Sequence, residues 1–154
     1  MCGRSNFYFM TIKTFDAYSR LSIIEINRLA NFLYEHSGEF RDSKRAIKKS
    51  LRYAVKDIAG LGGYVFTVEK QNEILGAVVV NKTGMDEYIP ENILVYIAVN
   101  AKYRGHGIAK TLIDYTLKYC KGDITLYINK DNPVIRLFEE KGFKKRNIEM
   151  RLVR

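Results

Sequence analysis

The chain has 154 residues, of which 47% are hydrophobic and 28% charged, and its net charge is +9. This apolar content is too high for a disordered chain and is sufficient for a core. No apolar run approaches the roughly 20 residues of a membrane-spanning helix. The two cysteines, Cys2 and Cys120, can build neither a disulfide framework nor a zinc site. We therefore expect a cytoplasmic protein with one domain over residues 10–154, preceded by an N-terminal extension, residues 1–9, that is a candidate for disorder.

The positive charge gathers in two places, residues 41–52 and residues 141–154. A surface of this sign attracts polyanions such as nucleic acid, acidic lipid headgroups or a phosphorylated small molecule. A solvated face is the simpler interpretation of both stretches, because no zinc finger and no RNA-binding aromatic signature accompanies them. We therefore expect neither nucleic acid nor a membrane among the partners.

The first part of the chain predicts a short strand and two helices. Thr11–Phe15 alternates as a strand does. Tyr18–His36 reads as a helix, since its apolar residues recur at spacings of three and four along one face: Ile23, Ile26, Ala30 and Leu33. Ser43 can cap a second helix that runs to about Ile58, before a glycine-rich break.

Three strands follow. Tyr64, Phe66 and Val68 alternate, and Gln71-Asn72-Glu73 has the composition of a turn. Ile74–Val80 then returns as a buried strand, which completes a hairpin. After a loop, Ile93–Val99 is an unbroken apolar run long enough to cross the core.

The last third predicts helices at Gly107–Lys121 and Asn132–Lys141, and strands at Ile124–Ile128 and Phe143–Val153. Pro133 suits the first turn of the shorter helix, because proline is tolerated there. The complete order is β-α-α-β-β-β-α-β-α-β, without repeats or a linker. This order predicts a single α/β domain.

The segment with the clearest chemistry is Arg104-Gly105-His106-Gly107, between the buried strand and the helix that follows it. A helix start exposes unpaired N–H groups and the positive end of the helix dipole, and glycines let a phosphate approach the main chain. Arg104 and Lys110 add full positive charge. The glycine spacing fits neither a Walker loop nor a dinucleotide fingerprint. Geometry alone allows two interpretations of this segment, a phosphate-binding site and a structural turn.

The run Arg104-Gly105-His106-Gly107-Ile108-Ala109 resembles the Arg/Gln-x-x-Gly-x-Gly/Ala signature of the GCN5-related N-acetyltransferase (GNAT) superfamily. It stands between elements that look like the family's fourth strand and third helix. Ile128–Phe143 is similar to the family's strand five, helix four and closing Gly-Phe, and the order of elements matches from Met10 onward. The resemblance implies an α/β (α+β) fold. Its sheet would be mixed, largely antiparallel, splayed between strands four and five, and flanked by helices.

The resemblance also implies acetyl-CoA as co-substrate, with no metal. Ile97 and Val99 would give backbone partners to the pantetheine arm, Asn132 would hold the arm from the other side, and Phe138 would pack near the thioester. The loop and the helix start would bind the pyrophosphate, with His106 at the variable position of the motif: Arg104, Gly105, His106, Gly107, Ile108, Ala109 and Lys110. The N–H near Val99 would polarise the thioester carbonyl.

Two departures from the family pattern concern the proton transfers. Many members carry a tyrosine in helix four as acid for the leaving sulfur, and this sequence has Phe138 at that position. The same alignment, counted back from Gly142-Phe143, places Asp131 rather than Asn132 at the family's usual asparagine. The glutamate that some members carry on strand four is replaced by Ile93. Glu91 lies two residues earlier and could act as a base through a water. Equally, it could be a solvated carboxylate at a loop end.

The function that we infer from the sequence is acetyl-CoA-dependent N-acetyl transfer, in which a primary amine attacks the thioester directly in a ternary complex. The acceptor amine would belong to a small molecule, a peptide or a protein, and a homodimer is common for such folds. A non-catalytic acyl-CoA-binding module with the same fold is the alternative, since the tyrosine and the strand-four glutamate are missing. A nucleic-acid binder that uses the basic faces is a third hypothesis.

Overall fold

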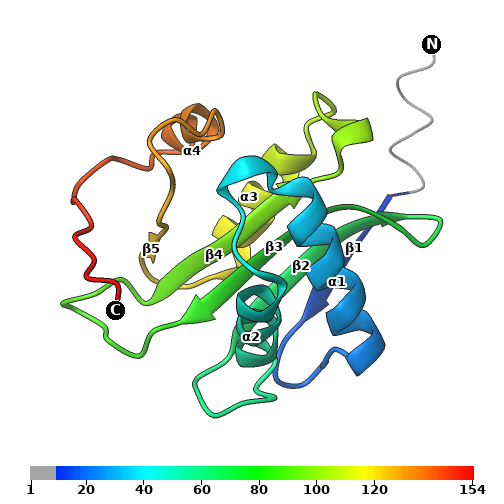
Figure 1. Cartoon of the computed structure of the whole chain (residues 1–154), viewed down its shortest axis with the longest axis horizontal. Coiled ribbons are helices and arrows are strands. Elements are labelled where there is room, and N and C mark those ends of the chain that lie inside the picture. The colour runs from blue at the N-terminus through cyan, green and yellow to red at the C-terminus, as the bar shows by residue number, and fades with distance from the viewer. Residues whose placement is uncertain (1–9) are drawn as a thin grey trace.

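A computed structural model describes residues 10–154, so the expectation for residues 1–9 lies outside the described part. One sheet forms the centre of the molecule, and its strands follow one another across it in chain order (Figure 1). They are β1 (Met10–Phe15), β2 (Gly63–Lys70), β3 (Glu73–Lys82), β4 (Asn92–Val99) and β5 (Ile124–Thr125). Neighbours from β1 to β4 are antiparallel, whereas β5 lies parallel to β4. The sheet is therefore mixed and largely antiparallel, as the sequence predicts.

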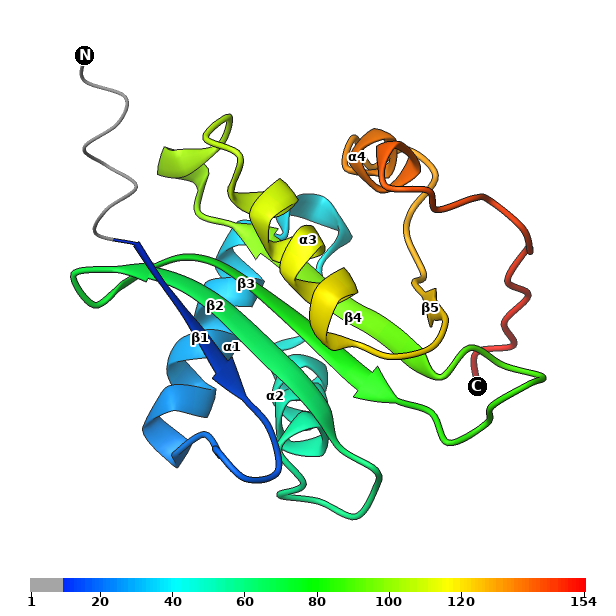
Figure 2. The ribbon, with the colours of Figure 1, turned by 180° about the vertical axis from the view of Figure 1, so that it is seen from behind.

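Helices cover both faces of this sheet. Helices α1 (Ile23–His36) and α2 (Lys44–Ala54) lie on one face, and α3 (Ile108–Tyr119) lies on the other, which faces the viewer in Figure 2. The short helix α4 (Ile135–Glu140) follows β5. Two single turns of 3₁₀ helix, η2 (Gly38–Phe40) and η3 (Ala101–Tyr103), follow α1 and β4.

The predicted helices exist, but their ends differ from the prediction. Helix α1 begins at Ile23 rather than Tyr18, because the Ser22 hydroxyl accepts a hydrogen bond from the Glu25 amide at 3.1 Å and caps the helix there. Helix α2 has its predicted Ser43 cap. It ends at Ala54 rather than Ile58, and Lys56 already has a positive φ of 58°, which a helix cannot contain.

Two separate apolar cores lie on the two faces of the sheet. The first packs α1 and α2 against it, with Leu33 and Ile47 among its fully buried side chains. The second packs α3 and Phe138 of α4 against the other face, around Phe66 and Leu112. Strand β3 contributes to both, and its run of six buried apolar residues from Ile74 to Val80 is broken only by Gly76. A strand buried on both faces explains this unbroken apolar pattern.

Strand β4 contains a bulge at Val95. Tyr96 pairs with Val79 and Leu94 pairs with Val80, so one residue of β4 has no partner on β3. A bulge reverses the alternation of side chains along a strand. Leu94 consequently packs into the core under α3, whereas Tyr96 packs against the core under α1 and α2.

The two strands expected after α3 are corrected by the structure. Strand β5 is limited to Ile124 and Thr125, and residues 143–153 form no strand. Ile148, Met150 and Leu152 alternate as a strand would, but all three are exposed. Alternation predicts which residues could share a face of a sheet. A strand also needs the edge of a neighbouring strand to pair with, and the edge of β5 is only two residues long.

Cys120 closes α3 inside the second core, and its burial raises the pKa of the thiol to about 11 despite the opposing charge of Lys82. At pH 8, about one thiol in a thousand would then be ionised. In a Cys2→Ser protein, we expect an aromatic disulfide reagent to modify Cys120 far more slowly in buffer than in urea. Equal rates in the two solvents would contradict the burial of this thiol.

Candidate functional site

The main cavity lies where β4 and β5 diverge. The two strands pair only at Asn92 with Ile124 and at Ile93 with Thr125, and then separate. Beyond that point, a cavity of about 1070 Å³ opens between Leu94–Val99 of β4 and the segment 126–134 that follows β5. The segment 36–42 between α1 and α2 and the loop before α3 complete its walls. The predicted splay of the sheet is therefore present.

Strand β4 turns unpaired amides toward this cavity. The Asn100 amide donates to the Leu75 carbonyl of β3 at 2.8 Å. Because N–H groups alternate in direction along a strand, the amides of Ile97 and Val99 point away from β3. On that side, β5 has already departed. Ile97 and Val99 thus offer backbone groups to a ligand between the strands.

The loop before α3 has the conformation that its glycines allow. Gly105 and Gly107 have φ values of 82° and 77°, and a Cβ atom added to either would meet nothing within 4 Å. The backbone there is open to an incoming group. Gly107 is the N-cap of α3 and has no side chain to satisfy the first turn, so the amides of Ile108, Ala109 and Lys110 face outward. Together with Arg104 and Lys110, they form a cationic end of the cavity.

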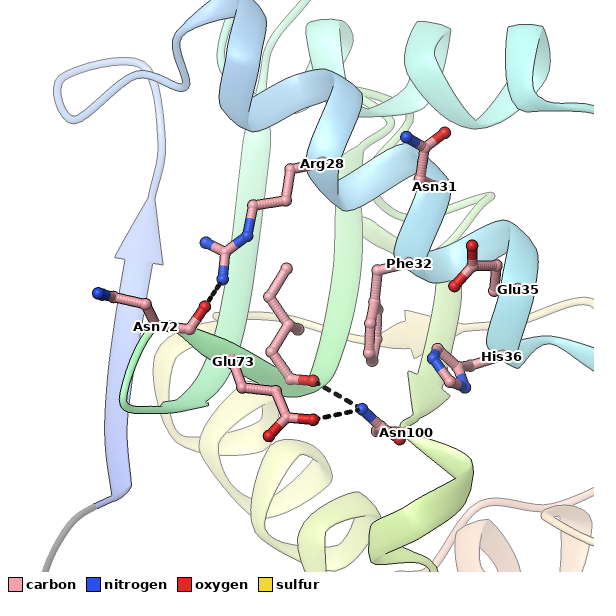
Figure 3. Close-up of a pocket in the computed structure, with 9 residues that line it drawn as sticks. Arg28, Asn31, Phe32, Glu35, His36, Asn72, Glu73 and Asn100 are labelled. Carbon is pink, nitrogen blue, oxygen red and sulfur yellow. Dashed lines mark hydrogen bonds between the residues drawn. The ribbon is translucent and has the colours of Figure 1, made fainter.

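A polar network holds the entry to this loop. Figure 3 shows it in a shallower groove between α1, the β2–β3 turn and the end of β4. The Asn100 side-chain amide donates to Glu73 and to the Ile74 carbonyl at 3.4 and 3.3 Å, and its oxygen accepts from the Lys102 amide. Across the groove, Arg28 donates to the Asn72 carbonyl. The groove's polar groups thus bond largely to one another.

Two further contacts continue the network to the loop. The Tyr103 hydroxyl donates to Glu73 at 2.9 Å, and this hydrogen bond raises the pKa of Tyr103. His36 at the end of α1 accepts from the Ala101 amide through Nδ1, and its carbonyl accepts from Arg104 at 3.3 Å. Helix α1 and the β2–β3 turn therefore fix where the strand ends and the loop begins.

The structure brings most of the residues predicted for the cofactor site to one cavity. Nine of them line it: Ile97, Val99, Arg104, Gly105, Gly107, Ile108, Ala109, Lys110 and Asn132. The side-chain oxygen of Asn132 accepts from the Val134 amide at 3.0 Å and so orders the turn before α4. Asp131, the other residue weighed for this position, does not line the cavity.

Three predicted residues lie outside the cavity wall. His106 is exposed at the loop tip, and Phe138 is buried in the second core, with its ring edge-to-face against Phe143 at 5.2 Å. Glu91 precedes β4, where its carboxylate accepts from the Asp123 amide at 2.6 Å. In this arrangement Glu91 ties the α3–β5 connection to the start of β4, and a role as base stays a prediction.

The cavity wall also contains polar residues outside the predicted cofactor site. They come from four segments: Glu39, Arg41 and Asp42 before α2, Tyr96 on β4, Tyr127 after β5, and Arg151 in the C-terminal segment. The Tyr96 hydroxyl donates to Asp42 at 2.6 Å. Burial, together with this hydrogen bond and the charge of Asp42, strongly raises the pKa of Tyr96. Periodicity could not find this pair, because the Val95 bulge decides the side on which Tyr96 lies.

The family comparison agrees with this geometry. A model of the acetyltransferase (GNAT) family matches residues 23–143, which is most of the chain. The chain therefore belongs to this family, and the resemblance that the two sequence motifs indicate is confirmed. Acetyl transfer is the general activity that the family name describes.

Solved structures share the fold at low sequence identity. Ard1 from Thermoplasma volcanium superposes with a TM-score of 0.67 at 17% identity, over 90% of this chain and 85% of that one. An aminoglycoside acetyltransferase from an uncultured soil metagenomic sample, in complex with sisomicin, gives 0.61 at 17% identity, over 95% and 97%. The aminoglycoside N-acetyltransferase AAC(6')-Iy, in complex with CoA, gives 0.62 at 14% identity, over 94% of each chain. At these identities the likeness shows the fold.

Residues 10–154 contain neither a membrane-spanning helix nor a metal-binding cluster. Helices there are too short or too polar to cross a membrane. Within the same residues, His, Cys, Asp and Glu do not gather in threes as a metal site would need.

Asn100 is the residue through which the network holds the end of β4. We expect Asn100→Ala to lower the free energy of unfolding by about 1–3 kcal/mol, because it leaves the Ile74 carbonyl and the Lys102 amide without their partner. Urea denaturation measures this change. Asn27→Ala, the same substitution on the exposed face of α1, should stay within about 0.5 kcal/mol of the parent. Equal effects of the two substitutions would show that the network contributes nothing.

Proposed function

We propose that the protein is an acetyl-CoA-dependent N-acetyltransferase, in which a primary amine attacks the thioester directly while both substrates are bound. The observation that carries this proposal is the cavity between the diverging strands, with unpaired amides on β4 and an open helix start at one end. Family membership supports the same chemistry.

Three features of the chain fit the proposed co-substrate. The amides of Ile97 and Val99 suit an extended arm that adds beside β4 as a strand would. The open backbone at Gly105 and Gly107 suits a diphosphate. Arg104 and Lys110 supply the charge that a diphosphate needs. Acetyl-CoA, when bound, would supply an activated acetyl thioester.

The chain's contribution to the rate would come from positioning and from carbonyl polarisation. The Val99 amide is directed away from β3 and could donate to the thioester oxygen. Ile93 and Phe138 stand at the positions where the family pattern calls for proton-transfer residues, and neither side chain can transfer a proton. Glu91, two residues before Ile93, does not line the cavity. The amine proton would then pass through a water to a base, or the amine would bind already neutral. Neither route needs a strong side-chain base in contact with the amine.

Direct attack fits the side chains of the cavity better than an acyl-enzyme does. Cys120 is buried in the second core and lies outside the cavity wall. Ser37 lines the cavity, but its hydroxyl donates to the Leu33 carbonyl. Neither residue is arranged as a nucleophile beside a base.

The acceptor class follows by analogy. The soil-metagenome acetyltransferase is bound to sisomicin, and the CoA-bound neighbour is an aminoglycoside N-acetyltransferase. We propose that this protein also takes a small molecule that carries a primary amine.

The decisive experiment measures binding and turnover separately. Calorimetry should detect acetyl-CoA binding, and thiol release should then follow with at least one member of a panel of primary amines. Binding without turnover across the panel would favour the alternative function, a non-catalytic acyl-CoA-binding module, which the missing tyrosine at Phe138 and the missing glutamate at Ile93 motivate. Absence of both would overturn the proposal.

Gly107 tests the proposed diphosphate contact. We expect Gly107→Val to weaken CoA binding at least tenfold, because a branched side chain at a φ of 77° both strains the loop and covers the helix start. Gly142→Val is a matched control, since Gly142 has a φ of 97°, open space around it and no place in the cavity wall. Gly142→Val should lose stability as Gly107→Val does, because both place a branched side chain at a positive φ, but it should keep its affinity for CoA. If Gly107→Val keeps its affinity as well, the loop is not the site.

The kinetic order tests direct attack. When both substrates are varied, double-reciprocal plots should intersect, because acetyl transfer requires a ternary complex. Mass spectrometry after incubation with acetyl-CoA alone should leave the protein mass unchanged. Parallel plots, with a gain of one acetyl group on the protein, would instead show an acyl-enzyme.

A further inference from the structure

The end of the cavity opposite the loop is built around a carboxylate fixed in place by a tyrosine. Asp42 lies between η2 and α2, and Tyr96 lies in the middle of β4, 54 positions along the chain. Their 2.6 Å hydrogen bond uses one oxygen of the carboxylate. A carboxylate can accept several hydrogen bonds, so the other oxygen is still able to bind a donor in the cavity.

The bulge at Val95 in β4 places Tyr96 where its hydroxyl reaches Asp42. Without it, the alternation of β4 would turn Tyr96 toward α3, on the other face of the sheet. Bulges re-aim side chains, and this one directs a hydroxyl across the cavity to the segment before α2. The pairing therefore joins two walls of the cavity at its acceptor end.

The charges around this carboxylate leave Asp42 open to a cation. The guanidinium of Arg41 stacks over the Tyr34 ring at 4.1 Å, and Arg151 pairs with Glu149. The hydrogen bond to Glu149 is the main cause of the raised pKa of Arg151, and the charge of Asp42 adds to it, so Arg151 is a cation that competes for Asp42. Neither Asp42 nor Glu39 forms an ion pair within residues 10–154. The cavity wall is thus cationic at Arg104 and Lys110 and carries the Asp42 carboxylate beside Tyr96 of β4.

We propose that Asp42, positioned by Tyr96, binds an ammonium group of the acceptor that is not the amine acetylated. The preferred acceptor is then a small molecule with at least two amino groups. This inference rests on the proposed acetyltransferase function.

The chemistry of the step requires two different groups. The attacking amine must be neutral, because its lone pair forms the new bond, and a carboxylate contact favours the charged form instead. A second ammonium group can stay charged on Asp42 while the first amine loses its proton. The length of the Tyr96 side chain separates Asp42 from the backbone of β4, which leaves room for the spacer between the two amines.

Tyr96 acts in this scheme as a positioning residue. Its raised pKa keeps the hydroxyl protonated, and that proton is donated to Asp42. A hydroxyl used in this way orients the carboxylate and is not available to the leaving sulfur.

The test compares three acceptors with similar spacers: putrescine with two ammonium groups, butylamine with one, and gamma-aminobutyrate with a carboxylate in place of the second. In the parent protein, kcat/KM should be at least about tenfold higher for putrescine than for butylamine, and lowest for gamma-aminobutyrate. Asp42→Asn should remove most of the advantage of putrescine, mainly through KM, and leave butylamine little changed. Tyr96→Phe should cause a smaller loss in the same direction.

Controls separate this inference from the function on which it rests. Asp57→Asn, which removes an exposed carboxylate paired with Arg52 outside the cavity, should leave all three values unchanged. Calorimetry should give the same acetyl-CoA affinity for Asp42→Asn as for the parent. Three outcomes would overturn the inference. They are equal losses for all acceptors, a preference for gamma-aminobutyrate, and no turnover of any of these amines by a protein that binds acetyl-CoA. Failure to bind acetyl-CoA at all would instead overturn the proposed function.

Discussion

The separation of β4 from β5 is the feature on which the rest of the site depends. Two parallel residue pairs join these strands, and beyond them the backbone of β4 has no neighbour on one side. Unpaired strand amides are costly when buried and are satisfied by water or by a ligand. A cavity therefore opens between the last two strands of the sheet, where Ile97 and Val99 present their amides. Every other wall of the site is placed relative to this gap (Figure 1).

The two cores and the polar network make this gap rigid. Strand β3 is buried on both faces and pairs along one edge with β4, the strand that lines the cavity. Glu73, Asn100 and Tyr103 then hold the point at which β4 becomes the glycine loop. Preorganised backbone donors lose little entropy when a ligand binds, which suits a site built mainly from main-chain groups.

The distribution of charge gives the cavity a direction. Basic side chains and the start of α3 lie beyond the end of β4, and Asp42 lies beside Tyr96 in the middle of that strand. Such a gradient suits an anionic co-substrate that enters from one end and a cationic acceptor that enters from the other. The net charge of +9 does not reveal this arrangement, because the acidic residues of the cavity stand next to the basic run of α2 in the sequence.

The sequence by itself determined the order of the elements from Thr11 to Lys141, the glycine loop at 104–107 and the family, because periodicity and local motifs are carried by residues close together in the chain. Only the tertiary structure decided which edges pair. It reduced β5 to two residues, left 143–153 without a strand, and turned Tyr96 toward Asp42 through a bulge. Strand pairing, register and bulges depend on contacts between distant segments, and no local pattern encodes them.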